Sequence, residues 1–499
     1  MALAYRQPGV TVEEEVSPTI SPLLAAPGLL CLVGPSQGYQ TRTDQFVLSG
    51  TTPVALPGLP AGATVQAVLS VKDALDPTNG AADGSGYVLT TDYTVSTANG
   101  TITRVGAGGI ADNTLVVVTY TYIPENYFTP IRLYDQGSVE SRFGSSLNST
   151  GTAINSPLSY AAGIAFENGA SSVVCLPLFA RDTPGDPDTA ASQPDATETA
   201  ALATWQDTLF VLRDIEDINI IVPVIGQSTP NVGDATQVSL FGAIQDHIYF
   251  MANQDQYIVA VLGEDSSASN TVAQKATIRS HAATLRSRYN GVVAEQTVLL
   301  NISKLTRALP SAIGTKLTLG AQYAAAAVGG MLASRPVSST LTRQAIAGFL
   351  EINDYRDLDD KNTDGATGLF VLEQKGYNIF VRHGVTLDNS NSAKRELSVV
   401  RAKHRTVESV RDTLDRQIVG QIVADGNATS IVRTTVIGVL EQLRVQRDII
   451  DYSGVEARFT SLDPTTIQVR FSYRPAFPVN YINVVFSLDL SAGLIEATI

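Results

Sequence analysis

The chain has 499 residues, of which 44% are hydrophobic and 16% are charged, and its formal net charge is −14. This apolar content excludes a disordered chain, and the length predicts about three domains. The acidic balance excludes nucleic acid as the main partner, because phosphate binding needs a basic surface, and it disfavours an anionic membrane for the same reason.

The first twenty residues are typical of an arm rather than of the start of a compact domain. They contain no apolar secretory region, so we expect a soluble chain made in the cytoplasm. One short strand is predicted from the alternation of apolar and polar residues in Val10, Thr11, Val12, Glu13 and Glu14. A lone strand has no local partner, and an unpaired strand edge recruits other chains. The alternative is that this strand pairs within its own domain and completes the sheet there.

A short apolar run at 28–33 predicts a buried strand and contains Cys31. The second cysteine, Cys175, also lies in an apolar run. Two cysteines cannot form a disulfide framework, and we predict two buried free thiols.

From about 39 to 129, turn residues separate short β runs, and no helical pattern is visible. The predicted strands are Val65–Val71, Tyr87–Thr90, Thr101–Val105 and Leu115–Tyr122. This segment is therefore predicted to be a small all-β module inserted into another domain.

From 152 to 301, a helical pattern precedes an apolar strand four times. The predicted helices are at about 153–167, 199–215, 238–252 and 271–288, and the strands are Ser172–Phe179, Ile218–Val224, Tyr257–Leu262 and Val292–Leu300. Repeated units of this kind predict an α/β layer with a largely parallel sheet. The apolar stretch Ala321–Leu332 is too short to span a bilayer and predicts a packed Ala/Gly helix.

The last 120 residues read as an α+β domain. Amphipathic helices are predicted at Val407–Val419 and Thr429–Asp448, and a strand is predicted around Val469 and Phe471. A second late strand places on one face Ile482, Val484, Phe486, Leu488 and Leu490. Residues 491–499 form a short tail.

Two patterns could carry chemistry, and each has a simpler interpretation. Gly34–Gly38 matches the G-x-S-x-G motif of a serine hydrolase using Ser36, but turn-rich β sequence follows where that motif requires a helix. Asp360–Gly365 copies the first half of a calcium loop, but the required acid falls on Val371, so we predict a polar turn, with a chance cation site as the alternative. The scattered histidines exclude a zinc site of the usual spacing. We therefore predict no catalytic residue, cofactor or metal.

Segment 394–416 is a basic exception in an acidic chain, with seven basic residues against four acidic ones. Its candidate contact residues are Lys394, Arg395, Arg401, Lys403, Arg405 and Arg411. Two interpretations stay open. One is a solvated helix with ion pairs between successive turns, and the other is a docking strip for an acidic protein.

Several ordered segments resemble one known family. They are YRQPGVTVEE at 5–14, LCLVGPSQG at 30–38, the β segment at 92–122, the Ala-rich stretch at 325–333 with SSTLTR at 338–343, and GYN at 376–378 with Arg401 and the DP and PAFP motifs of 463–478. This family is that of the contractile phage tail sheath proteins, whose opening arm reads PGVY-x-x-E. The resemblance covers most of the chain.

The resemblance implies an α/β and α+β multidomain fold: an α/β core with an inserted all-β domain and an α+β C-terminal domain with strand-exchanging arms. The implied parts are an N-terminal arm (1–20), an α/β core (21–38 and 130–375), an outer β domain (39–129), a C-terminal domain facing the tube (376–490) and a tail (491–499).

The resemblance also implies a structural function and no enzymatic one. Subunits would polymerise as stacked six-fold rings around an inner tail tube, assembled in the host cytoplasm, and would contract to drive the tube through the bacterial envelope. The implied partners are other copies of the chain, the tube protein, the baseplate and the tail terminator, with no nucleic acid and no membrane insertion. The arms would exchange strands through 10–14 and the late strand at 482–490, although which late strand is exchanged stays open, and the basic segment would face the tube. A tailocin or an injection system would share these features.

Overall fold

The structure, a computed structural model, describes residues 28–37, 39–75, 86–181, 191–194, 202–215, 217–225, 234–264, 272–309, 315–353, 356–460, 465–480, 482 and 484. The chain divides into two compact units. We call Ala26–His404 with Ala476–Ile499 the body unit, and we call the other, whose described residues are 405–460 and 465–475, the hairpin unit. Each unit is described by itself.

A six-stranded sheet forms the centre of the body unit. Its order is β14-β13-β12-β1-β9-β8, and neighbours are parallel except for the antiparallel pair β8–β9. The strands are β1 (Leu30–Gly34), β8 (Ile131–Leu133), β9 (Val173–Pro177), β12 (Ile220–Pro223), β13 (Val259–Leu262) and β14 (Thr297–Leu299). The predicted parallel α/β sheet is confirmed.

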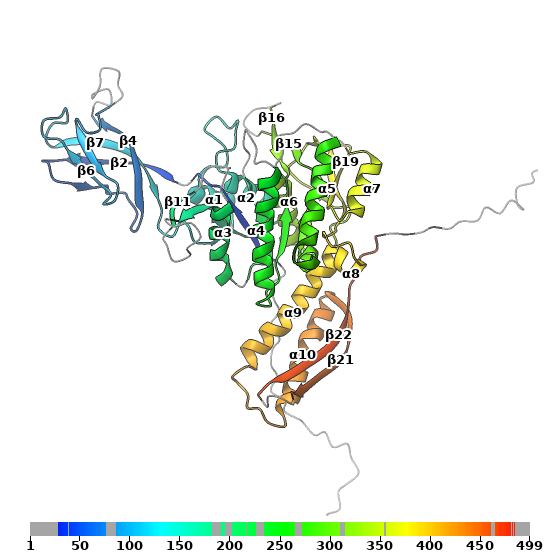
Figure 1. The fold of residues 1–499 in the computed structure, drawn as a ribbon. Coiled ribbons are helices and arrows are strands. Elements are labelled where there is room, and N and C mark those ends of the chain that lie inside the picture. The colour runs from blue at the N-terminus through cyan, green and yellow to red at the C-terminus, as the bar shows by residue number, and fades with distance from the viewer. Residues whose placement is uncertain are drawn as a thin grey trace, which may run out of the picture. The chain divides into compact units, whose positions relative to one another are not determined.

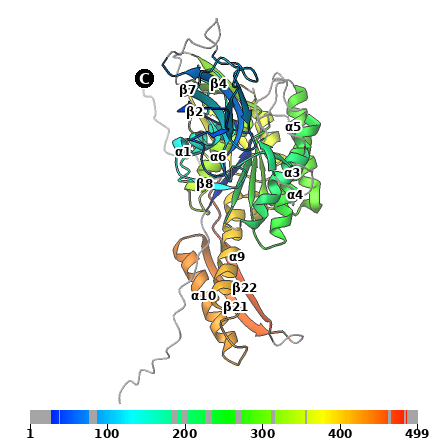
Figure 2. The ribbon, with the colours of Figure 1, turned by 90° about the vertical axis from the view of Figure 1, so that its left-hand side faces the viewer.

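Helices cover both faces of this sheet, which explains why its strands are continuous apolar runs. Leu30 and Leu32 pack with α2 (Pro157–Glu167) and α6 (Ala321–Ser334) on one face. Cys31 and Val33 belong to the cluster on the other face. The helices of that face are α3 (Leu202–Phe210), α4 (Asp234–Ala252) and α5 (Val272–Ser287), which lie side by side (Figures 1 and 2).

The two cysteines are buried free thiols, as predicted. Cys31 and Cys175 lie on the neighbouring strands β1 and β9, but in the clusters of opposite faces. Burial raises the pKa of both thiols, because a thiolate loses its hydration there. Both cysteines therefore serve as small apolar core residues.

The predicted Ala/Gly helix is α6, and it packs closely against α2. A Cβ atom on Gly330 would lie 2.4 Å from the carbonyl oxygen of Ala165, inside the backbone of α2. Only a residue without a side chain allows this approach. No helix among the described residues is long and apolar enough to cross a membrane.

Replacement of this glycine tests the packing. We expect Gly330→Ala to lower the free energy of unfolding by about 1–3 kcal/mol, because the added methyl group forces the two helices apart. The control is Gly365→Ala in α7 (Leu358–Ala366), where the nearest atom is 4.0 Å away. This control should stabilise the protein by about 0.5–1 kcal/mol, because alanine favours helix more than glycine does. Urea unfolding can be followed by the fluorescence of the single tryptophan, buried Trp205; equal stabilities for G330A and wild type would contradict the prediction.

Two buried histidines make the stability of the body unit depend on pH. Burial, together with the charge of Arg213, lowers the pKa of His247 to about 4. Burial also lowers the pKa of His404, whose ring stacks on Tyr257 at 4.8 Å between centroids. A histidine with a lowered pKa stays neutral in the fold and takes up a proton on unfolding. The free energy of unfolding therefore falls as the pH drops from about 6.5 toward 4.

We expect the contribution of His247 to this loss to be about 2 kcal/mol between pH 7 and pH 5. Replacing His247 with Phe removes the titrating group and keeps a ring in its place. Urea unfolding at the two pH values should therefore show a smaller loss for His247→Phe than for wild type. An unchanged loss would show that His247 takes up its proton in the folded state as readily as in the unfolded one.

Smaller elements complete the body unit. Three further sheets have the orders β16-β15-β18, β17-β20-β19 and β10-β11. Their strands are β10 (Phe179–Arg181), β11 (Ala191–Pro194), β15 (Lys304–Ala308), β16 (Lys316–Gly320), β17 (Ala345–Ile346), β18 (Glu351–Ile352), β19 (Val371–Lys375) and β20 (Asn378–His383). The short helices are α1 (Gln136–Phe143), α7, α8 (Ser392–Arg395), η1 (Val211–Asp214), η2 (Arg288–Gly291) and η3 (Ala294–Gln296).

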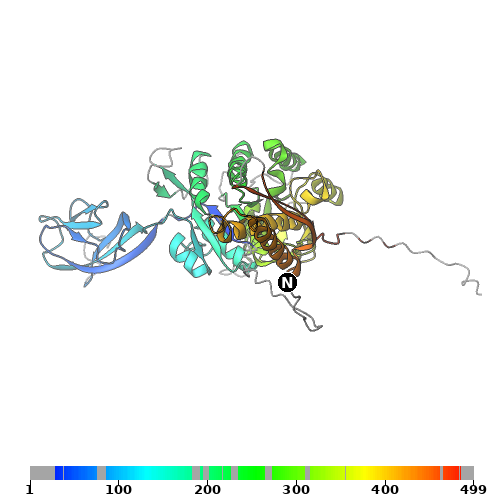
Figure 3. The same cartoon turned by 90° about the horizontal axis from the view of Figure 1, so that it is seen from below.

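The predicted β insert has two antiparallel sheets, β2-β7-β4 and β3-β6-β5, whose strands are blue in Figure 3. The strands are β2 (Gln40–Leu48), β3 (Val54–Ala55), β4 (Thr64–Asp73), β5 (Tyr93–Ser96), β6 (Thr101–Arg104) and β7 (Thr114–Ile123). The described part of 39–129 contains no helix, in agreement with the prediction. The strand predicted at 87–90 is wrong, because Leu89 forms only an isolated bridge and the backbone turns at Thr90, whose φ is 70°.

The hairpin unit contains two long helices and a two-stranded sheet (Figure 1). The elements are α9 (Leu397–Gln417), which begins in the body unit, α10 (Ala428–Val445), β21 (Ile449–Phe459) and β22 (Ile467–Pro475). The predicted stripe of α10 is buried at Val436, Val439 and Leu440 and packs with residues of the hairpin. Both predicted late helices and the first predicted late strand are confirmed.

Candidate functional site: the edges of the C-terminal hairpin

The hairpin β21–β22 is the clearest candidate assembly surface. Within the described ranges, each of its strands pairs only with the other. A two-stranded hairpin is marginally stable by itself, and here α10 supports it from one face. The outer backbone edge of each strand has no described strand beside it, and such an edge is a template for further pairing.

The two faces of the hairpin differ in character. On the outer face, residues of opposite charge lie opposite one another in the register of the two strands, Asp451 with Arg474 and Glu456 with Arg470. On the inner face, Ile449 and Val455 of β21 are buried. The inner residues of β22 are only half-buried, namely Ile467, Val469, Phe471 and Tyr473. The apolar face is therefore incompletely covered along β22.

The edges of the two strands also differ. The register of the pair shifts between Ile449 and Asp451 and again between Ser453 and Glu456, so the irregularities fall on β21. Gly454, with φ of 64°, lies at the second shift. A bulge twists its strand and makes the edge a poorer template for pairing, and both bulges are in β21. Strand β22 contains no extra residue. The edge of β22 is the more regular template.

An apolar groove lies beside the first residues of β22. It has a volume of about 230 Å³ and is formed by the end of α9, the start of α10 and the start of β22. Its apolar lining residues are Leu414, Ile418, Val419, Ile422, Val432, Ile467 and Val469. Val419 is 64% exposed, so a large apolar side chain faces solvent at the groove. The arrangement suits an added strand with apolar residues on one side.

The predicted arm residues lie largely outside the described residues. These are Val10, Thr11, Val12, Glu13, Glu14, Phe486 and Leu488. Ile482 and Val484 are described, belong to no strand of this chain, and are 81% and 74% exposed. The exchange of strands through these residues stays a prediction.

The basic segment does not form a continuous exposed strip. Arg401 is 4% exposed and donates to the carbonyl oxygen of Leu332 at 2.7 Å. Arg405 is 9% exposed and lies 3.2 Å from Asp448. Buried guanidinium groups of this kind stabilise the fold and leave no charge on the surface of the chain.

The other basic residues of the segment are more accessible, but most have a partner in the chain. Lys403 pairs with Glu295, Lys394 lies 3.6 Å from Asp388, and Arg411 pairs with Asp412 at 2.7 Å. Arg395 is half-buried. A solvated helix with ion pairs between successive turns would pair residues three or four positions apart. The partners observed here lie outside the helix or, for Arg411, at the next residue, so they do not have that spacing. Contact with a tube stays a prediction.

Ser36 does not have the setting of a hydrolase nucleophile. It is 1% exposed, and its hydroxyl group lies 2.5 Å from the hydroxyl group of Tyr127. The next described element is β2 and not a helix, so the strand–helix turn of the motif is missing. Ser36 is a structural residue at the end of β1.

The polar turn predicted at 360–365 is wrong, because these residues form the helix α7. Asp357 caps its first turn by accepting from the backbone N–H of Asp360. Asp360 pairs with Lys275 and Arg279, so its carboxylate serves the fold. No cluster of three candidate metal ligands occurs in the part of the chain that the structure describes.

Comparison with known proteins agrees with this architecture. No family model matches the chain. The chain is 28% identical over 432 residues to the tail sheath protein of Mycobacterium phage Bxz1, covering 83% of this chain and 68% of that protein. Its fold is similar to the anti-feeding prophage helical sheath in the contracted state, with a TM-score of 0.55 at 12% identity, covering 97% of this chain and 100% of that one. It is also similar to the sheath of the extracellular contractile injection system PVC in the contracted state, with a TM-score of 0.53 at 11% identity, covering 98% and 99%.

Proposed function

We propose that this chain is the structural subunit of a contractile tail sheath. It polymerises as stacked six-fold rings around an inner tail tube and contracts to drive the tube through the bacterial envelope. The observation that carries this proposal is the 28% identity to a phage tail sheath protein over 83% of the chain. The fold similarity to two contracted sheaths supports it independently.

Strand addition at the hairpin explains how the polymer is held together. An arm of one subunit, through residues 10–14 or the late strand at 482–490, lies along an edge of the hairpin of another subunit. Each hydrogen bond of such a ladder contributes about 0.5–1.5 kcal/mol, and several form per strand. Repetition through every subunit gives a lattice that stays connected while its domains move.

Contraction is a change between two states of this lattice. Subunits assemble in a long, metastable array, and a signal from the baseplate lets them move into a shorter and wider array of lower energy. A bias of about 1–2 kcal/mol per subunit is sufficient, because many subunits change together. The chain then needs no nucleotide or cofactor, and its partners are other copies, the tube, the baseplate and the terminator of a virion tail. A similar fold occurs in an anti-feeding prophage baseplate structure.

Electron microscopy of the purified protein tests the function. We expect hollow striated tubes at concentrations at which the subunit associates. A protein that stays monomeric and monodisperse at every concentration and salt condition would contradict the proposal. A serine hydrolase using Ser36 predicts instead a hydrolytic activity that Ser36→Ala removes.

A pair of substitutions tests the strand addition at β22. We expect Val469→Glu to prevent tube formation, because it places a charge in the apolar groove where an added strand would pack. Gln468→Glu changes the neighbouring residue, which is exposed on the outer face, and should leave tubes intact. Circular dichroism checks that both variants fold. Tubes of normal appearance from folded V469E would place the contact elsewhere.

The sheath of a tailocin or an injection system is the second candidate. The fold similarity to the anti-feeding prophage and PVC sheaths favours it, and the sequence identity to a phage sheath favours a phage tail. Particles purified from the producing bacterium separate the two, because a phage carries a DNA-filled head on the tail.

A further inference from the structure

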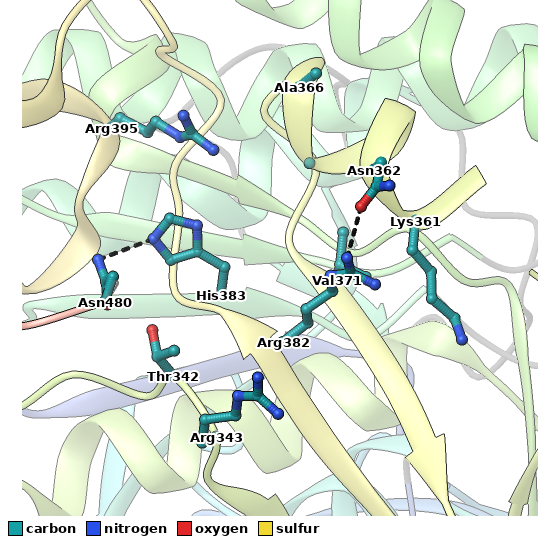
Figure 4. A pocket seen from close by; sticks show the side chains of 11 residues that line it. Thr342, Arg343, Lys361, Asn362, Ala366, Val371, Arg382, His383, Arg395 and Asn480 are labelled. Atoms are coloured by element: carbon teal, nitrogen blue, oxygen red, sulfur yellow. Dashed lines mark hydrogen bonds between the residues drawn. The ribbon is translucent and has the colours of Figure 1, made fainter. Parts of the chain in front are cut away.

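A basic pocket of about 420 Å³ lies in the body unit (Figure 4). Side chains reach it from α7, from β20, from α8 and from the turn before β17. Its four cationic residues are Arg343, Lys361, Arg382 and Arg395. Residues far apart in the sequence therefore bring four positive charges to one cavity of a chain whose net charge is −14.

Only part of this charge is balanced inside the chain. Arg382 donates to the side-chain oxygen of Asn362 at 2.6 Å and lies 3.7 Å from Glu373. Among the described residues, Arg343, Lys361 and Arg395 form no ion pair, and the Nε atom of Arg395 is buried without a hydrogen-bond partner. Three cations are thus available to a ligand.

The backbone holds the pocket in a fixed shape. Arg343 has φ of 67°, a left-handed conformation that an arginine rarely adopts. Its N–H donates to the carbonyl oxygen of Val381 at 2.7 Å, and the N–H of Val381 donates to Gln344 at 2.8 Å. Two backbone hydrogen bonds with β20, one at Arg343 and one at the next residue, therefore hold a strained residue in place, with its side chain at the pocket (Figure 4).

The pocket also borders the start of the predicted C-terminal arm. Asn480 lines it and donates to Glu396 at 3.0 Å, and Glu396 lies 2.7 Å from His383. These contacts fix the chain two residues before Ile482. A ligand bound in the pocket would therefore lie close to Asn480, two residues before the predicted arm begins.

We propose that this pocket binds carboxylate groups of a second copy of this chain. Three unneutralised cations repel one another until an anion enters, and guanidinium groups pair with carboxylates through two parallel hydrogen bonds. A second copy is complementary in charge to the pocket, because it carries 48 acidic against 34 basic residues. This inference rests on the proposed function, because the sheath polymer is what holds a second copy against the pocket.

Zero-length cross-linking of the polymer tests this inference. A carbodiimide joins the Nζ atom of Lys361 to a carboxyl group that contacts it, with loss of water to the reagent. Tubes assembled from equal amounts of ¹⁴N and ¹⁵N subunits distinguish bonds between chains from bonds within one chain by mixed-isotope peptides. We expect mixed-isotope cross-links from Lys361 to Asp or Glu residues. Lys316, which is exposed and pairs with Glu351 of its own chain, is the control and should give cross-links within one chain.

Two variants complete the test. Lys361→Arg keeps the charge but cannot form the amide, so tubes should form without the cross-link. Arg343→Glu combined with Arg395→Glu should raise the concentration needed for tube formation at least tenfold, and the corresponding lysine variants should restore it.

The outcomes separate this inference from the proposed function. Tubes without mixed-isotope cross-links at Lys361 overturn the inference and leave the function intact. Binding of inorganic phosphate that Arg343→Gln abolishes, together with no cross-link between chains, would instead assign a small-anion site. Absence of wild-type tubes contradicts the proposed function itself.

Discussion

Deletion of residues 1–18 is expected to leave a folded monomer that no longer polymerises. The body unit keeps its six-stranded sheet and both helical layers, since none of these elements includes the deleted residues. The polymer, by contrast, loses the strand that each subunit is proposed to add to a neighbour. Size-exclusion chromatography and electron microscopy measure assembly, and the emission of buried Trp205 reports on the fold.

A single substitution within the arm sharpens this experiment. Val12→Pro removes one N–H from the predicted strand and prevents regular pairing, whereas Val12→Ile keeps the strand pattern. We expect V12P to behave like the deletion and V12I to behave like wild type. Tubes of normal length from both the deletion and V12P would show that the N-terminal arm does not hold the lattice.

Removal of the carboxylate of Asp364 is expected to be the most destabilising single change in the body unit. Asp364 is 1% exposed and accepts from Arg279 at 2.7 Å and from the amide of Asn301 at 3.1 Å. The Nε atom of Arg356, which is also buried, lies 3.6 Å from the second carboxylate oxygen. Asp364→Ala takes this partner away from buried Arg356 and from half-buried Arg279, and breaking a buried pair in this way costs about 3–5 kcal/mol.

Two further variants separate the loss of these ion pairs from a general effect of substitution on helix α7. Asp364→Asn keeps a hydrogen-bond acceptor and should cost less than alanine. Asp359→Ala, at an exposed position of the same helix, should change the free energy of unfolding by less than about 1 kcal/mol. Urea unfolding gives all three values. A loss for D364A no larger than for D359A would mean that the ion pairs contribute nothing net.

The central sheet was predictable because its strands are buried on both faces. Continuous apolar runs such as Leu30–Val33 and Ile220–Val222 admit few other interpretations, and the helical patterns between them identify a parallel sheet. The Ala-rich helix α6 was predictable because it too is a continuous buried run of small and apolar residues. Its close packing on α2 was not, because it depends on the backbone of Ala165 facing Gly330.

Polar elements were missed. Strand β2 carries Gln40, Thr41 and Arg42 in place of apolar residues and shows no clear alternation. Helix α7 is rich in aspartate, which has a poor helix propensity, and its capping by Asp357 outweighs that preference. The polar composition of this segment favours a loop. The ion pairs of Asp360 and Asp364 with α5 favour the helix instead.

In the candidate sites, too, local patterns predicted the elements but not the contacts between them. Alternation along β22 predicted a strand with one apolar face, and that strand exists. The groove beside it depends on the approach of Ile418 to Ile467, and the basic pocket brings Arg343 together with Arg395. Proximity between residues so distant in the sequence follows from the fold, and no local pattern encodes it.

In the proposed sheath, neighbouring subunits complete the hairpin sheet. A cryo-electron microscopy reconstruction of the assembled tubes, at a resolution that separates strands, tests it most directly. We expect the edge of β22 to carry a strand from another subunit, with the apolar side chains of that strand in the groove lined by Ile418 and Val469. A lattice in which β21 and β22 remain a two-stranded sheet, with the arms elsewhere, would contradict it.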